Sequence, residues 1–464
     1  MKKLEITFIV FFALVLALAL GRNGSANPGI ARNSLFWMVA WSVGALLIFP
    51  GNRLPLRISK SGLILVGLIL GYGWLMVVNA RAYYLFNELS FQEISGRIWE
   101  GGPGSIAKTA SATKMIEVSG LFLVFFAAVR SRGSETWKRL LAILPLLGAV
   151  ITIVGLFHRV LDAPSVWFVD QTHPATFFAP FIYNANAGSY LNFSGALGFS
   201  FWVSSFWKGS RSRTIGWAII TALCFVGVIA TASKGAFLIL LLTLGLCLFF
   251  HRKRLLKYLP GIWVELKGRG FEGKLIILAI IVMILSFAGV GVQNLITRMD
   301  SFIEDARDGS AATVEGRLTM MRMMGKMASL DEGGWVGFGP GSFEIIVPYF
   351  TVDEAYALGG RLEHGHSDPL QLLVEWGYLG AFLWIAFGLG ALRSGLGGLK
   401  SRKEQAAKPL IRGMMIALIS MTLHSGFDFP FGIFSLKFAA VFVCGLLWGR
   451  SETTRARKRS SLES

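Results

Sequence analysis

Two histidines stand directly before a long apolar run in the stretch "HGHSDPLQLLVEWGYLG" (364–380). A neutral imidazole there can accept a proton from a hydroxyl group, with Asp368 or Glu363 close enough in sequence to orient it. We therefore take His366 as a candidate general base, and His364 as a candidate contact for His366 or for an acceptor molecule. The structural alternative is a plain helix start, with Ser367 or Asp368 as the N-cap.

Cations precede these histidines in "TVEGRLTMMRMMGKMAS" (313–329). At helical spacing its apolar residues share one face: Val314, Leu318, Met321, Met324 and Ala328. Arg317 projects into that face, whereas Arg322 projects from nearly the opposite side. A cation on a buried face needs an anionic partner, which is either a carboxylate such as Glu315 or a ligand phosphate.

Glycines alternate in the next segment, "GWVGFGPGSF", at Gly337, Gly339 and Gly341. This run does not open a helix after a strand within a βαβ unit, so the pattern does not favour a dinucleotide site. Glycines at this spacing permit tight turns and a close backbone approach. We expect a compact turn that joins two helices.

Further ionisable residues lie in or beside apolar stretches, where such groups are functional candidates by default. Lys234, in "TASKGAF", either binds an anionic ligand or extends to lipid headgroups. Glu375 lies two turns into the run after His366 and is a candidate lining residue of an acceptor cleft. His424 and Asp428 are one helical turn apart and are expected to pair with each other.

The composition indicates which elements position these residues. Hydrophobic residues make up 54% of the 464, and the mean hydropathy is +0.59, which predicts an all-α polytopic membrane protein. About twelve stretches are long and apolar enough to cross a bilayer. They are 4–20, 34–50, 62–78, 115–130, 138–157, 189–206, 214–232, 235–250, 274–294, 370–392, 411–427 and 434–449.

Lys and Arg residues concentrate in every second connection and in the C-terminal tail, which predicts that both termini are cytoplasmic. The first stretch also resembles a signal peptide, but an uncleaved first helix gives an even number of spans. The net charge of +18 is explained by this asymmetry, so we expect contact with anionic lipid and no nucleic-acid binding. The longest outer connection is 295–369, and its helical patterning argues against disorder. The chain is read as one membrane domain, 1–464.

Cysteine usage adds an exclusion. Cys224, Cys247 and Cys444 all fall within apolar stretches, so no structural disulfide outside the membrane and no zinc-ligand spacing are expected.

The spacing around the histidines resembles the signature of a known family. After His366 come Ser367, nine residues, Gly377, two residues and Gly380. This resembles the signature of the O-antigen ligase and polymerase family of membrane glycosyltransferases. The Arg317 segment with its Gly-rich turn, "PFIYNANAGSYL" (180–191) and "LHSGFDFPFGI" (423–433) are similar to other parts of that family. The resemblance covers about 165–450, and the N-terminal third matches only in hydropathy.

The resemblance implies a GT-C-like inner-membrane enzyme with a helical extracytoplasmic loop before its tenth helix. Such an enzyme transfers a glycan from a polyprenyl diphosphate carrier to an acceptor hydroxyl, with inversion and without a metal or other cofactor. By motif, His366 matches the family histidine and Arg317 the loop arginine. Lys234 stands where the family usually has Ser-Arg-Gly, so the charge is kept and the bidentate fork is lost.

We therefore predict His366, Arg317 and Lys234 as catalytic residues. Predicted substrate contacts are His364, Arg322, Asn186 and Glu375. The acceptor is a lipid such as lipid A-core, a polysaccharide or a protein. Two alternatives stay open: a polymerase that extends a carrier-linked chain, and a non-enzymatic transporter or flippase, for which more charged residues deep in the helices are expected.

Overall fold

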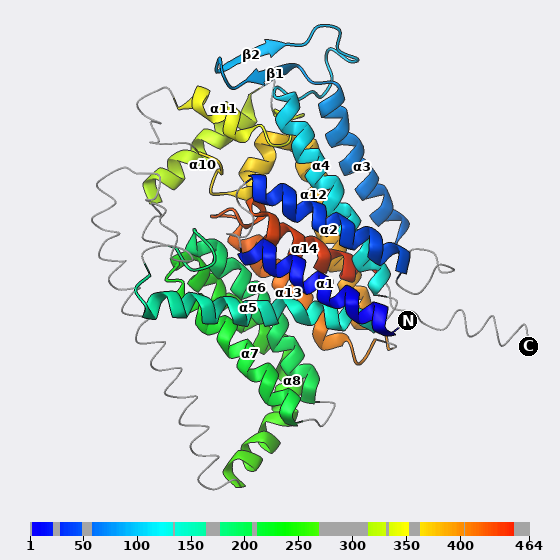
Figure 1. Cartoon of the computed structure of the whole chain (residues 1–464), viewed down its shortest axis with the longest axis vertical. Helices are drawn as coiled ribbons and strands as arrows, with labels where there is room; N and C mark the ends of the chain where they lie inside the picture. Colours follow the sequence, from blue (N-terminus) through cyan, green and yellow to red (C-terminus); the bar gives the residue numbers. More distant parts are fainter. Residues whose placement is uncertain are drawn as a thin grey trace, which may run out of the picture.

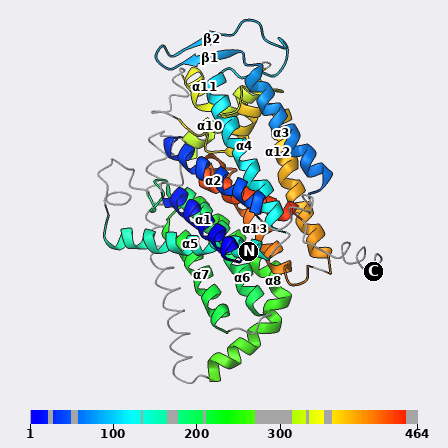
Figure 2. The same cartoon turned by 45° about the vertical axis from the view of Figure 1, so that its right-hand side comes forward.

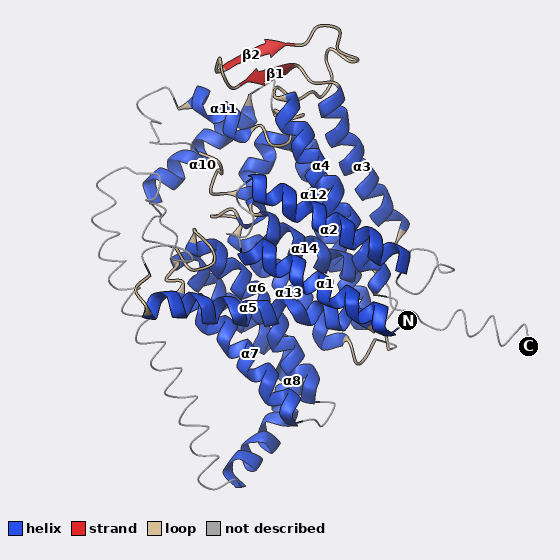
Figure 3. Ribbon diagram, viewed as in Figure 1, coloured by secondary structure: helices blue, strands red, loops and turns tan. Residues whose placement is uncertain are grey.

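The computed structural model of the chain describes residues 2–21, 28–48, 58–132, 135–163, 177–206, 211–268, 314–330, 334–351, 362–402 and 404–449. These residues are almost entirely helical, as Figure 3 shows. The exception is one antiparallel hairpin, β1 (Ala82–Leu85) and β2 (Ser90–Glu93), in which Tyr84 pairs with Phe91. The hairpin lies at one end of the molecule, here termed the hairpin end, and α7 and α8 extend toward the opposite end (Figure 1).

Eleven of the twelve predicted apolar stretches coincide with described helices, and 274–294 lies outside the described residues. The helices are α1 (Lys2–Gly21), α2 (Pro28–Ile48), α3 (Lys60–Val78), α4 (Lys108–Ser131), α5 (Thr136–Val160), α6 (Asn184–Ser205), α7 (Arg211–Ala230), α8 (Lys234–Gly268), α12 (Asp368–Lys400), α13 (Lys408–His424) and α14 (Phe434–Trp448).

Six of the described helices have the length and apolarity to cross a membrane: α3, α4, α5, α7, α8 and α12. The segments Glu5–Gly21 and Phe434–Trp448 are apolar but shorter. A bilayer core needs about 20 apolar residues in a helix. The protein is therefore a multi-pass, all-α membrane protein, whereas a total of about twelve spans stays a prediction.

Small residues let the helices of the main core approach one another closely. A Cβ atom built at Gly188 of α6 would lie 2.4 Å from Cβ of Ala236 in α8, and one built at Gly413 of α13 would lie 2.1 Å from Oγ of Ser200 in α6. Close packing of this kind holds helices together where lipid removes the hydrophobic driving force. The start of α8 is thereby fixed against α6.

A second, smaller apolar core lies at the hairpin end. It contains α10 (Val314–Ser329) and α11 (Phe343–Phe350), and Figures 1 and 2 both place these helices beneath the hairpin. The α10 residues that enter this core are Met320, Met323, Met324, Met327 and Ala328. Leu318 is 45% exposed, so the predicted apolar face was wrong in part. Because α10 is rich in methionine on several sides, its packing partners decide which side is buried.

The Gly-rich segment is the predicted turn between α10 and α11, and it inserts into a break in α12. Gly337, Gly339 and Gly341 all have positive φ, and so does Gly377 within α12. At the break, the amide N–H groups of Phe338 and Gly339 donate to the carbonyls of Val374 and Glu375 at 2.9 Å. The stretch 370–392 is therefore two helical pieces with a kink, and the turn satisfies the backbone groups that the kink exposes.

Candidate active site

His366 lies in the short link 362–367 directly before α12, on a strained backbone. Its φ is +48°, in the left-handed region that non-glycine residues rarely adopt. Ser367 occupies the N-cap position, and its carbonyl accepts a hydrogen bond from the amide of Gln371. The predicted helix start is therefore present, and a strained histidine stands beside it. Such strain is found most often where a functional group is held in place.

Aromatic rings pack against the two histidines. Phe429 stacks on His364, with ring centroids 4.5 Å apart, and on Tyr183 at 5.2 Å. The ring of His366 meets the same Phe429 edge-on at 4.8 Å. Edge-on and stacked rings are favourable geometries that restrict motion. One phenylalanine thus fixes the relative positions of His364, His366 and Tyr183.

Asp428, and not Asp368, is the carboxylate that faces His366. Oδ1 of Asp428 lies 4.0 Å from Nδ1 of His366, and its Oδ2 lies 3.9 Å from Nε2 of His424. His424 and Asp428 therefore lie next to each other, as expected, but Nε2 of His424 has no hydrogen-bond partner among the described residues, and Asp428 also faces His366. The Asp368 carboxylate instead accepts a hydrogen bond from the amide of Phe431 at 2.8 Å.

Burial and charge set the protonation of these groups. Burial, and then the positive charge of Arg317, lower the pKa of His366 to about 4. Burial, and then the charges of Lys114 and Lys437, lower the pKa of His364 to about 3. Burial raises the pKa of Asp428 to about 6, although Arg317 opposes this rise. Both histidines are consequently neutral at pH 7, and His366 can accept a proton.

Arg317 reaches the site through Tyr183. Its Nη2 donates a hydrogen bond to the Tyr183 hydroxyl at 2.9 Å. The same hydroxyl also interacts electrostatically with the carboxylate of Asp428 and lowers its pKa. Arg317, Tyr183, Asp428 and His366 thus belong to one polar cluster, although they come from α10, the start of α6 and two separate connections.

Lys234 begins α8 next to the same cluster, and its side chain is exposed. A Cβ atom built at Gly235 would lie 2.6 Å from the ring of Phe427 and 3.4 Å from Nε2 of His424. On the side of α6, the side-chain amide of Asn184 donates a hydrogen bond to the backbone carbonyl of Thr231 at 2.9 Å. The turn before α8 is therefore held between α6 and the end of α13, at the level of Tyr183 and His424.

Three other predicted residues have different surroundings. Arg322 is exposed on α10, away from its apolar core. Asn186 is 3% exposed, and its amide oxygen has no hydrogen-bond partner among the described residues. Glu375 accepts hydrogen bonds from the amide of Gly341 at 2.9 Å and from the side chain of Gln371 at 3.0 Å. Oε2 of Glu375 thus holds the Gly-rich turn against α12, while Oε1 is held by Gln371 within α12.

Sequence reasoning missed Tyr183 and the position of Asp428. It also did not anticipate that the carboxylate of Glu117 is an ion-pair partner of both Lys114 and Lys437. These two lysines are the cations that lower the pKa of His364. The Tyr-Asn sequence at the entry to α6 was the one available signal for Tyr183, because it lies in the segment that resembled the family.

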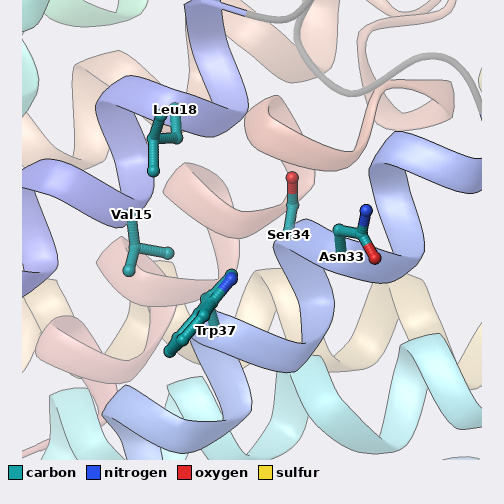
Figure 4. A pocket seen from close by; sticks show the side chains of 5 residues that line it. All are labelled: Val15, Leu18, Asn33, Ser34 and Trp37. Atoms are coloured by element: carbon teal, nitrogen blue, oxygen red, sulfur yellow. The ribbon is translucent and has the colours of Figure 1, made fainter.

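A cavity of about 160 Å³ lies elsewhere, between α1 and α2. Figure 4 shows its lining by Val15, Leu18, Asn33, Ser34 and Trp37. None of the predicted site residues belongs to it. Within the described ranges, no group of three or more His, Cys, Asp or Glu side chains could hold a metal ion. Cys224, Cys247 and Cys444 are buried free thiols.

Comparison with protein families gives one match. A family model described as O-antigen ligase matches residues 219–385. Lys234, Arg317 and His366 lie within the matched residues, whereas Tyr183 and Asp428 lie outside them. The family resemblance drawn from the sequence is thereby confirmed over 219–385, whereas 180–191 and 423–433 lie outside the match. A comparison with curated proteins finds no match.

Proposed function

We propose a function from the premise that residues 219–385 are an O-antigen ligase domain, which makes the protein a membrane glycosyltransferase of the ligase or polymerase type. In this proposal the protein transfers a glycan from a polyprenyl diphosphate carrier to an acceptor hydroxyl. One observation supports it most strongly. Arg317 donates a hydrogen bond to Tyr183, and the rings of Tyr183 and Phe429 both contact the neutral His366. A base and a fixed cation are what this reaction needs.

The proposed donor site contains Arg317 and Lys234. The diphosphate leaves with the electron pair of the broken bond to the anomeric carbon, so negative charge grows on it in the transition state. Fixed cations in a site with little water stabilise that charge. The buried Nε atom of Arg317 has no hydrogen-bond partner among the described residues, as expected for a group that completes its bonds with a ligand.

His366 is the proposed general base. As the acceptor oxygen forms its bond to the anomeric carbon, the hydroxyl proton passes to His366. A single displacement of this kind inverts the anomeric configuration. The ionised Asp428 carboxylate, 4.0 Å away, stabilises the imidazolium that results.

His364, Asn186 and Arg322 are proposed substrate contacts. Nδ1 of His364 and the amide oxygen of Asn186 are buried without partners in the part of the chain that the structure describes. Buried polar atoms are normally hydrogen-bonded, so each is suited to a ligand hydroxyl. Arg322 is suited to an anionic group because it is exposed. For Glu375, whose Oε2 holds the Gly-rich turn, we propose an indirect influence on the acceptor cleft.

The acceptor in this proposal is a lipid such as lipid A-core, a polysaccharide or a protein, and ligation is the favoured outcome. Polymerisation uses the same donor site with a different acceptor. We further propose that the protein lies in the bacterial inner membrane with both termini in the cytoplasm. The basic connections support this orientation and place His366 at the extracytoplasmic face.

The test is transfer by the full-length protein in detergent, from a purified polyprenyl diphosphate-linked glycan to several acceptors. We expect the wild type to release polyprenyl diphosphate and to couple the glycan, and His366→Ala and Arg317→Ala to do neither. Lys326→Ala, which removes an exposed cation from the same helix α10, is the matched control and should retain transfer.

Because Arg and Lys supply the positive charge in this proposal, a chelator should have no effect on transfer. The size of the product separates single ligation from polymerisation. Equal activity of the wild type and both alanine variants would refute the proposed site, and a wild type inactive toward every acceptor would refute the function.

A further inference from the structure

Tyr183 connects the cation of the candidate site to its carboxylate. It is the N-cap residue of α6, with φ −108° and ψ 115°, so its side chain leaves the helix start. Its hydroxyl accepts a hydrogen bond from Nη2 of Arg317 at 2.9 Å and acts electrostatically on Asp428. A tyrosine hydroxyl has one donor as well as acceptor sites, so the bond from Arg317 leaves the hydroxyl proton available to Asp428.

The ring of Tyr183 is held on two sides. It stacks on Phe429 with an interplanar angle of 11°, and it meets His366 edge-on with centroids 5.9 Å apart. Its carbonyl accepts a hydrogen bond from the amide of Asn186 at 3.2 Å. The ring and the backbone therefore fix the hydroxyl position independently of Arg317 and Asp428.

The hydroxyl also separates two opposite charges that face one site. Arg317 acts electrostatically on Asp428, and a direct ion pair between them would neutralise the guanidinium. A guanidinium engaged bidentately by a carboxylate has fewer donors left for a phosphate. With Tyr183 between them, Arg317 keeps donors available, and Asp428 keeps an oxygen directed at His366.

We propose that Tyr183 is a positioning residue that holds the Arg317 guanidinium and the Asp428 carboxylate in fixed places relative to His366. This inference rests on the proposed transfer reaction. It adds a residue that lies outside the matched 219–385 and that touches no reacting atom. Misplacement of a catalytic group by about 1 Å can reduce a rate by about 100-fold, so the expected effect is large enough to measure.

The test compares two tyrosines of the same region. Tyr183→Phe keeps the stacked ring and removes the hydroxyl. Tyr190→Phe, about two turns further along α6, removes a buried hydroxyl that donates to the carbonyl of Leu144 at 3.1 Å, away from Arg317. Each variant loses one side-chain hydrogen bond, part-buried at Tyr183 and buried at Tyr190, so their effects on folding are comparable.

The readouts are kcat and KM for the polyprenyl diphosphate-linked donor, and the pH dependence of kcat/KM, in the full-length protein. We expect Tyr183→Phe to lower kcat/KM at least about tenfold, and Tyr190→Phe to leave it within about twofold of the wild type. The Tyr183 hydroxyl holds the pKa of Asp428 down. Its loss should therefore raise that pKa and move the acid limb of the profile to higher pH in Tyr183→Phe alone.

The pH of the acid limb does not depend on the amount of folded protein, so it separates positioning from stability. The inference would be overturned if the acid limb of Tyr183→Phe did not move and its activity fell only in proportion to the folded fraction, as measured by size exclusion. If Tyr183→Phe had the rate and pH profile of the wild type while Arg317→Ala was inactive, this inference would be overturned and the proposed function would stand. If the wild type transferred no glycan, both the proposed function and this inference would be refuted.

Discussion

Nδ1 of His366 and Oδ1 of Asp428 lie 4.0 Å apart, although α12 and α13 separate these residues in the chain. This distance is too long for a hydrogen bond, so the carboxylate acts on the imidazole through its charge. The relationship makes Asp428 part of the candidate site and predicts how transfer should respond to pH.

Asp428→Asn should lower kcat/KM by about tenfold or more, because the imidazolium formed in the transition state loses a facing negative charge. Asp428 has a pKa of about 6, so it is ionised above pH 6 and protonated below it. Wild-type kcat/KM should therefore fall as the pH drops through 6. In Asp428→Asn that limb should move to about pH 4, where His366 itself becomes protonated.

A pH–rate series on purified protein checks this prediction. Glu363→Gln is the control, because Glu363 is close to His366 in sequence but exposed. A limb that stays at pH 6 in Asp428→Asn would show that another group is responsible.

Lys234→Ala should raise KM for the donor, because one cation of the proposed diphosphate site is lost. A charge-assisted hydrogen bond contributes about 1.5–3 kcal/mol, which corresponds to an increase of roughly 10- to 100-fold. Lys234→Arg should restore donor affinity, since the charge returns with a bidentate fork. Donor titrations of initial rates measure both. Lys253→Ala, an exposed cation further along α8, should be without effect, and an equal change there would contradict a specific role for Lys234.

Gly377→Ala should destabilise the protein and reduce transfer. A Cβ atom at Gly377 would lie 2.5 Å from the carbonyl oxygen of Trp335, and its φ of +64° strains any other residue by about 1–2 kcal/mol. Gly388→Ala in the same helix has open space around the new Cβ and should be neutral or stabilising. Thermal unfolding in detergent compares the two, and equal melting temperatures would refute the close contact at the break.

Glu117→Gln should lower stability by about 3–5 kcal/mol, because it leaves Lys114 and Lys437 without the carboxylate that they share inside the bundle. Glu135→Gln breaks an exposed pair with Lys138 and should cost at most about 1 kcal/mol. Chemical unfolding of the two variants in detergent would measure the difference. Similar values would indicate that the Glu117 cluster is open to water.

The sequence alone predicted features that depend on neighbours along the chain. Hydropathy located eleven helices, because a bilayer allows few structures other than helices to cross it. The alternating glycines predicted the turn between α10 and α11, because positive φ is a local property. The spacing after His366 predicted the family, and with it the candidate base and the cation Arg317.

Only the tertiary structure decided how these pieces meet. The bond from Arg317 to Tyr183, the shared carboxylate of Asp428 and the turn inserted at Gly377 join segments that are distant in sequence. No periodicity records such contacts, because a helical pattern states which residues share a face and not which partner covers it. The buried face of α10 shows this, since many methionines fit several faces and packing chose one. The sequence supplied the reactive groups, and packing around Phe429 determined their distances.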